Sequence, residues 1–140
     1  MPTSPSIIQL IFEKAFNEGD LTVIDEFLSP NHLAHSTFGG APKGPQGLKW
    51  LIVMFRTAFS DLHCRVEDEI SESNKHAAHW TMHGTHTGIF LGNPPTSRQV
   101  DVQGMIFARI ENGRIVEDWF LIDQLSILQQ LGLVPPPARH

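Results

Sequence analysis

The chain has 140 residues, a length that suits a single domain with a hydrophobic core of its own. Its net charge is −5 and no run of Lys or Arg occurs, which argues against a nucleic-acid surface. Cys64 is the only cysteine, so an internal disulfide and a cysteine-based metal site are excluded. The first residues lack a signal-peptide pattern and no apolar run reaches membrane-spanning length, so we expect a cytoplasmic protein that binds neither nucleic acid nor membrane.

The N-terminal half predicts three helices. The first is expected over residues 5–18 and the second over 20–28, each beginning behind a residue that can cap its N-terminus. Ser29-Pro30-Asn31 breaks the second helix, and residues 32–43 are expected to be loop with room for a short strand. The third helix, over residues 45–59, has the clearest pattern, because its apolar residues recur at i, i+3, i+4 and i+7.

The C-terminal half predicts strands followed by a short helix. Strands are expected over residues 63–71, 75–86, 99–110 and 114–122. A last helix begins near Asp123, which can cap it, and ends at Gly132. Helices first and strands later indicate an α+β domain in which helices pack on one face of an antiparallel sheet.

The sequence around Asn112-Gly113 decides which side chains share a face of the last two strands. A two-residue loop would pair Glu111 with Arg114, whereas a three-residue loop with a bulge at Gly113 would pair Ile110 with Arg114. The two registers differ by one residue, which turns every side chain of one strand to the other face. The three-residue loop separates apolar from mixed residues better, so we prefer it. Its apolar face carries Val100, Val102, Gly104, Ile106, Ala108, Val116, Asp118, Phe120 and Ile122.

Three histidines near the middle of the chain raise the question of a metal site. On a helix His79, His83 and His86 could share one side, but the glycines and threonines around them favour a strand. In a strand, His79 and His83 would stand about 13 Å apart and His86 would point to the opposite face. We therefore expect no metal ion, and interpret these residues as part of a hairpin.

Several motifs together resemble a known family. They are FNEGDL, SPNHLAH, GPQGLKWLIVMFRTAFSDL, GTHTGIFLGNPPTSRQVDVQG, RIENGRIVEDW, Asp123 and QQLGLVP, and they span Ile7 to Pro135. In this order and spacing they resemble the SnoaL-like polyketide cyclases, also known as ester cyclases. The resemblance implies a cone-shaped α+β fold of the nuclear transport factor 2 type. Its curved antiparallel sheet would have three N-terminal helices over the concave face, a short C-terminal helix and a deep pocket.

The same resemblance implies one domain over residues 1–140, with an ordered core of about 7–135, and a homodimer formed through the sheet. Members of the family close a ring by an intramolecular aldol reaction with no metal or cofactor, using an aspartate as acid/base and a histidine across the hairpin. Here the histidine position falls on Ile106 and the aspartate position on Phe120. Neither side chain can transfer a proton.

Asp118 is the leading replacement for the missing acid/base. It lies two residues before Phe120 on the same expected face, directly across from Ile106. Apolar surroundings disfavour the charged form of a carboxylate, which suits a general base that works near neutral pH. The alternative is a structural Asp118 that is hydrated or paired with Arg114 or with a helix residue.

Four further residues are expected to contact a substrate: His35, Gly104, Ile106 and Phe120. His35 could donate a hydrogen bond to a carbonyl or could merely close its loop. The sequence thus leaves two functions open. One is a cofactor-independent cyclase or isomerase that acts on a hydrophobic polyketide-like substrate through Asp118. The other is a non-catalytic dimeric protein that binds or shapes a hydrophobic small molecule.

Overall fold

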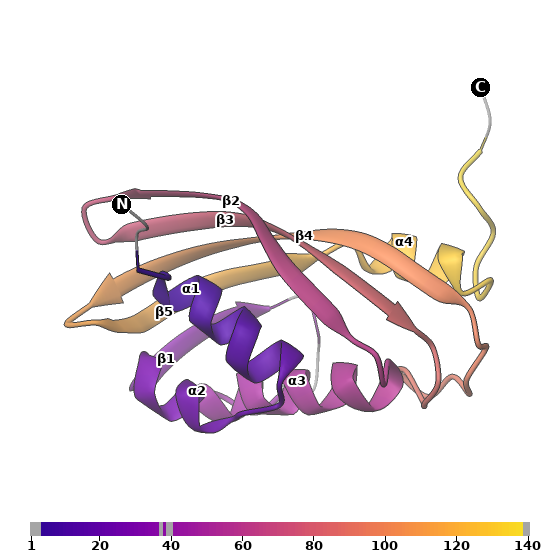
Figure 1. Cartoon of the computed structure of the whole chain (residues 1–140), viewed down its shortest axis with the longest axis horizontal. Coiled ribbons are helices and arrows are strands. Elements are labelled where there is room, and N and C mark those ends of the chain that lie inside the picture. Colours follow the sequence, from indigo (N-terminus) through magenta and orange to yellow (C-terminus); the bar gives the residue numbers. More distant parts are fainter. Residues whose placement is uncertain (1–3, 37, 39–40, 139–140) are drawn as a thin grey trace.

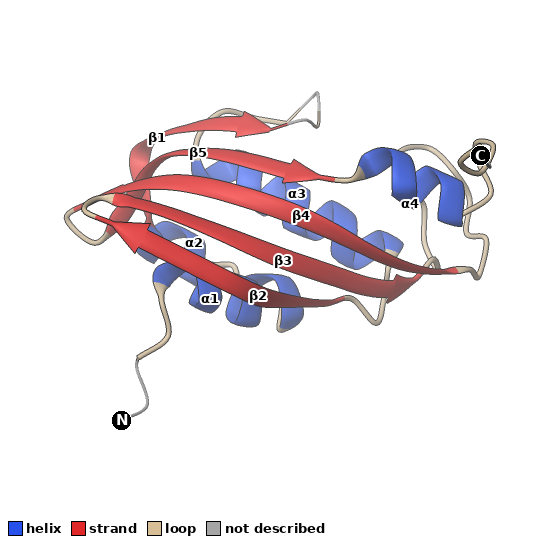
Figure 2. Cartoon of the chain, turned by 90° about the horizontal axis from the view of Figure 1, so that it is seen from above, coloured by secondary structure: helices blue, strands red, loops and turns tan. Residues whose placement is uncertain are grey.

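The computed structural model describes residues 4–36, 38 and 41–138, which form a curved five-stranded sheet with helices over one face (Figure 1). The strands are β1 (Leu28–Ser36), β2 (His63–Glu72), β3 (Lys75–Thr85), β4 (Gln99–Glu111) and β5 (Arg114–Ile122), in the spatial order β1-β5-β4-β3-β2. The helices are α1 (Ile7–Leu10), the π-helix η1 (Ile11–Asn17), α2 (Thr22–Phe27), α3 (Pro45–Ala58) and α4 (Gln124–Gln130). Figure 2 shows α1, α2 and α3 beneath the sheet and α4 at the end of β5. None of the described helices is long and apolar enough to cross a membrane.

Two of the helices, α1 and α4, begin behind residues whose side chains accept from their first backbone N–H groups. Ser6 and Gln9 form a capping box in front of α1, in which the Gln9 N–H donates to the Ser6 hydroxyl at 3.1 Å. The first helix therefore starts slightly later than the sequence predicted, and beyond Leu10 it widens into η1, which the sequence did not indicate. Asp123 caps α4 as predicted, because its carboxylate accepts from the Ser126 N–H at 3.0 Å.

Strand β1 is the main difference from the sequence prediction. The second helix ends at Phe27, and Leu28–Ser36 is a nine-residue strand that pairs in parallel with β5. Pro30 is tolerated inside this strand because β1 lies at the edge of the sheet, and the register shifts between Leu28 and Leu33. The sheet is antiparallel over β2–β5, as predicted, and gains one parallel pair at its edge.

The β4–β5 hairpin has a two-residue turn, so the preferred three-residue loop is wrong. Asn112 and Gly113 have φ angles of 52° and 74°, as a type I′ turn requires, and Glu111 pairs with Arg114. Type I′ turns match the twist of the flanking strands, which explains why the shorter loop is adopted.

A β-bulge beyond the turn restores the expected faces. The register between the two strands shifts by one residue at Val116, so that Ile106 pairs with Phe120 and Ala108 pairs with Asp118. Asp118 thus lies on the buried face, as predicted, but across from Ala108 and not from Ile106.

The core between sheet and helices is centred on Trp80 of β3, which is almost fully buried. Its ring contacts Phe12 of η1 and Phe120 of β5, with ring centroids 4.9 and 5.2 Å apart. Gly104 on β4 provides the room, because a Cβ atom there would lie 2.2 Å from the Trp80 ring. Gly104 therefore supports the core under Trp80.

Candidate active site

A cavity of about 360 Å³ lies between the helices and the buried face of the sheet. Helices α1, η1 and α3 form one wall, and strands β1, β4 and β5 form the other. Most of its side chains are apolar, among them Phe12, Phe16, Leu48, Ile106 and Phe120. The volume falls in the range of about 300 to 1,000 Å³ that is typical of small-molecule pockets.

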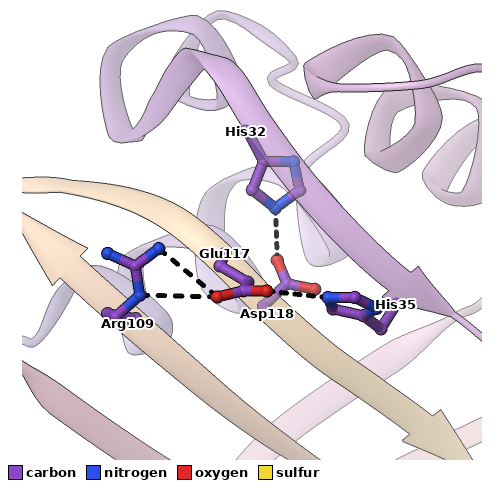
Figure 3. Close-up of polar contacts among 5 residues, drawn as sticks. All are labelled: His32, His35, Arg109, Glu117 and Asp118. Carbon is purple, nitrogen blue, oxygen red and sulfur yellow. Dashed lines mark hydrogen bonds and ion pairs between the residues drawn. The ribbon is translucent and has the colours of Figure 1, made fainter.

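Two polar side chains meet in this apolar wall, His32 of β1 and Asp118 of β5. The His32 Nε2 atom lies 2.6 Å from the Asp118 Oδ2 atom (Figure 3). The parallel register pairs Ala34 with Asp118, and His32 lies two residues earlier on the same face of β1. With Asp118 ionised, the Nε2–H group donates to the carboxylate and stabilises it inside the core.

Both members of this dyad are almost fully buried in the wall of the cavity. The Asp118 side chain is 8% exposed and the His32 side chain 1%, and both residues line the cavity. The other ring nitrogen of His32, Nδ1, is fully covered and has no hydrogen-bond partner within the described residues. A molecule in the cavity would therefore lie beside the dyad, of which Asp118 is the slightly more accessible member.

The four residues expected to contact a substrate are placed differently. Ile106 and Phe120 line the cavity and face each other across β4 and β5. Gly104 does not line it, because the Trp80 ring covers that position. His35 also lies away from the cavity, because it is three residues after His32 in the strand and points to the opposite face of the sheet.

On that opposite face His35 belongs to a polar cluster with Glu117 and Arg109 (Figure 3). Its Nε2 atom lies 2.9 Å from Glu117, and its ring stacks on Trp119 at 4.7 Å. Arg109 also contacts Glu117, at 3.3 Å. The hydrogen bond from His35, helped by Arg109, lowers the pKa of Glu117 below its ordinary value of 4.5.

Comparison with known proteins identifies the family of this chain. The model of the SnoaL-like polyketide cyclase family matches residues 6–131. The chain belongs to the SnoaL-like polyketide cyclase family. It is 32% identical over 122 residues to the nogalonic acid methyl ester cyclase of Streptomyces nogalater, an alignment that covers 84% of this chain and 90% of that protein.

Solved structures of similar proteins share the fold over nearly the whole chain. IdmH from Streptomyces antibioticus superposes with a TM-score of 0.77 at 30% identity, covering 90% of this chain and 96% of that one. TsrD from Streptomyces laurentii gives a TM-score of 0.80 at 26% identity, covering 95% of this chain and 100% of that one. The SnoaL-like α+β fold that the resemblance predicted is thereby confirmed.

The sequence of this SnoaL-like chain did not single out His32. The residue lay in a segment expected to be loop, where alternation of faces cannot be applied. Once β1 is known to be a strand, the spacing in SPNHLAH is informative, because His32 and His35 must point to opposite faces. The parallel pairing with β5 then decides which of the two histidines meets Asp118.

The three histidines of this SnoaL-like chain that raised the question of a metal site, His79, His83 and His86, have local partners. His79 lies 2.6 Å from Gln103, and His83 lies 3.5 Å from Asp101. His86 is buried and contacts Thr96 at 3.0 Å. Over the described ranges, no group of three His, Cys, Asp or Glu residues could hold a metal ion. The absence of a metal or other cofactor stays a prediction.

Proposed function

We propose that the protein catalyses cofactor-free ring closure or isomerisation of a hydrophobic polyketide-like substrate, with Asp118 as acid/base and His32 as its positioning partner. The observation that carries the proposal is a buried His–Asp dyad in the wall of an apolar cavity. The named activity of the Streptomyces nogalater relative, a methyl ester cyclase, supports a substrate of this class.

The reaction needs one group that takes and returns a proton. The Asp118 carboxylate would remove a proton from a carbon next to a carbonyl, and the C–H electron pair would form an enolate. The enolate carbon would attack a second carbonyl of the same chain, forming the new C–C bond. The resulting alkoxide would take the proton back from Asp118. The reaction gains or loses no atom or electron overall, so its stoichiometry requires no oxidant, reductant or metal ion.

The cavity would contribute by holding the chain folded and by excluding water. Aromatic and aliphatic walls from η1, α3, β4 and β5 favour a compact conformation in which the enolate and the second carbonyl are close. Ile106 and Phe120 would be part of this wall, at the positions where the resemblance puts the usual catalytic pair. Asp118 and Phe120 are two residues apart on one strand face, so the acid/base would be displaced by about 7 Å along β5.

The test compares three single variants on a linear polyketide methyl ester, with the cyclised product separated by chromatography. Asp118→Asn should lower the rate by about 10²- to 10⁴-fold, because it removes the proton-transferring group. His32→Gln should also lower it, by disturbing the carboxylate. Glu117→Gln is the matched control, since Glu117 is the neighbour of Asp118 on the other face. Full activity in Asp118→Asn would leave only a binding or shaping role for the cavity.

We also propose a homodimer formed through the sheet face away from the cavity. Met105, Phe107, Trp119 and Leu121 on β4 and β5 are 39–52% exposed, an apolar cluster of the kind found at subunit interfaces. Light scattering should give twice the chain mass at micromolar concentration, and Leu121→Glu should reduce it to the mass of one chain. A wild-type monomer would contradict the proposal.

A further inference from the structure

One oxygen of the Asp118 carboxylate has no protein partner within the described residues. The Oδ2 atom lies 2.6 Å from the Nε2 atom of His32. The Oδ1 atom has no such contact in the described part of the chain, and it is not fully covered. His32 therefore holds the carboxylate by one oxygen and leaves the other with lone pairs that can accept a proton.

The walls around this carboxylate offer few hydrogen-bond partners to water. Ile106 of β4 and Ile115 and Phe120 of β5 line the same side of the cavity, and Asp118 is the only carboxylate among the described lining residues. A carboxylate in water must lose hydrogen bonds from its hydration shell before it can take a proton from carbon. A C–H group that enters this cavity meets a carboxylate already surrounded by apolar side chains.

The cavity has room for a planar molecule of two fused rings. A cavity of about 150 Å³ between aliphatic and phenyl side chains is large enough to bind benzene. This cavity measures about 360 Å³. Phe16 of η1 and Phe120 of β5 both line it, and their rings are nearly parallel, with an angle of 8° between the planes. A flat aromatic ligand can therefore pack against both rings in one orientation.

The N-terminal end of α3 contributes positive potential on the opposite wall. Gly44, which precedes α3, and Gly47 and Leu48 of its first turn line the cavity. The unpaired N–H groups at a helix N-terminus carry a partial positive charge. The sheet wall thus supplies a base, and the helix wall stabilises an oxygen that gains negative charge during a reaction.

We infer that the site also catalyses eliminations from planar carbon acids, in which a leaving group departs from the atom next to the carbon that loses its proton. This inference rests on the part of the proposed function that makes Asp118 the base, and it needs no second carbonyl. Benzisoxazoles are simple substrates of this class. Asp118 takes the proton from the ring carbon, and the C–H electron pair completes the nitrile. The N–O bond breaks and its electron pair leaves with the oxygen as a phenolate. Asp118 then releases the proton to solvent, so no co-reactant is needed.

The test uses 5-nitrobenzisoxazole, whose ring opening gives a yellow nitrophenolate that absorbance measures directly. The full chain is compared at pH 7 with acetate at the same concentration. Asp118→Asn removes the base, and Glu117→Gln is the matched control, because Glu117 is the neighbour of Asp118 on the other face. Melting curves show whether each variant is folded. Indole, a planar bicyclic molecule that cannot undergo this elimination, is added to the wild type as a competitor for the cavity.

The wild type should open the ring at least about 10²-fold faster than acetate, as expected of a positioned general base. Asp118→Asn should lose at least about 10²-fold in rate, and Glu117→Gln should keep the wild-type rate. Indole should raise KM without changing kcat. An unaccelerated reaction, an unchanged rate in Asp118→Asn, or no effect of indole would each overturn the inference. Ring closure of a polyketide ester that depends on Asp118, with no ring opening of the benzisoxazole, would overturn the inference and leave the proposed function intact.

Discussion

The dyad should show strong energetic coupling between His32 and Asp118. Their side chains are 1% and 8% exposed, and the atoms that join them are 2.6 Å apart, so both are desolvated in the core. His32→Leu alone leaves a buried carboxylate without its partner, which costs about 3–5 kcal/mol of the free energy of unfolding. For a chain of this length that loss corresponds to a fall in melting temperature of roughly 10–15 °C.

The double variant His32→Leu, Asp118→Leu removes both polar groups together. An apolar pair of similar volume should cost far less than the sum of the two single variants, because no unpaired buried charge remains. We expect a coupling free energy of at least about 2 kcal/mol from the double-mutant cycle. Urea unfolding followed by tryptophan fluorescence measures the wild type, the two single variants and the double variant, and their denaturant slopes (m-values) should be equal.

If the double variant lost as much free energy of unfolding as the two single variants together, the predicted coupling would be refuted. Losses below about 0.5 kcal/mol for His32→Leu, the size expected of a surface substitution, would show that Asp118 is hydrated in the folded state. The dyad would then be no buried pair, and the proposed acid/base role would lose its structural basis. His35→Leu is the matched control, because that histidine binds Glu117 on the sheet face away from the cavity.

Three further predictions concern the rest of the fold. Gly104→Ala should lower the free energy of unfolding by about 1–3 kcal/mol and change the fluorescence of Trp80, because the new Cβ atom would overlap the Trp80 ring and the backbone of β5. An unchanged melting curve would contradict this packing. Burial raises the pKa of Cys64 to about 12, so the thiol should resist alkylation at pH 8 until urea unfolds the chain, and rapid labelling of the folded protein would speak against it. The pKa of Glu117 is lower in the folded than in the unfolded state, so its ionised form stabilises the fold fully above pH 4.5, and this stabilisation is lost as the pH falls through the folded pKa. The difference in stability between the wild type and Glu117→Gln, measured from urea midpoints at pH 7 and pH 3, should therefore be smaller at pH 3. An equal difference at both pH values would exclude this linkage.

The sequence by itself determined the elements whose signals are local. The helix over residues 45–58 follows from its apolar periodicity, and the last helix follows from the cap at Asp123. The alternation within each of the last two strands also separated the buried from the exposed face and put Asp118 on the buried one, whereas next to the turn Ile115 is buried and the expected Val116 is only half-buried. Each of these features depends on residues within a few positions of one another, so a single stretch of sequence contains the information.

Tertiary structure alone decided the turn, the edge strand and the dyad. The bulge at Val116 corrects the faces after a two-residue turn, and pairing across two strands is needed to see it. The segment around Pro30 carries the signals of a loop, and it becomes a strand only because β5 offers a free edge. His32 and Asp118 are 86 residues apart in the chain, and neither residue's neighbours specify the other. Their meeting depends on the parallel register of β1 and β5, a long-range contact that forms only when the sheet is assembled.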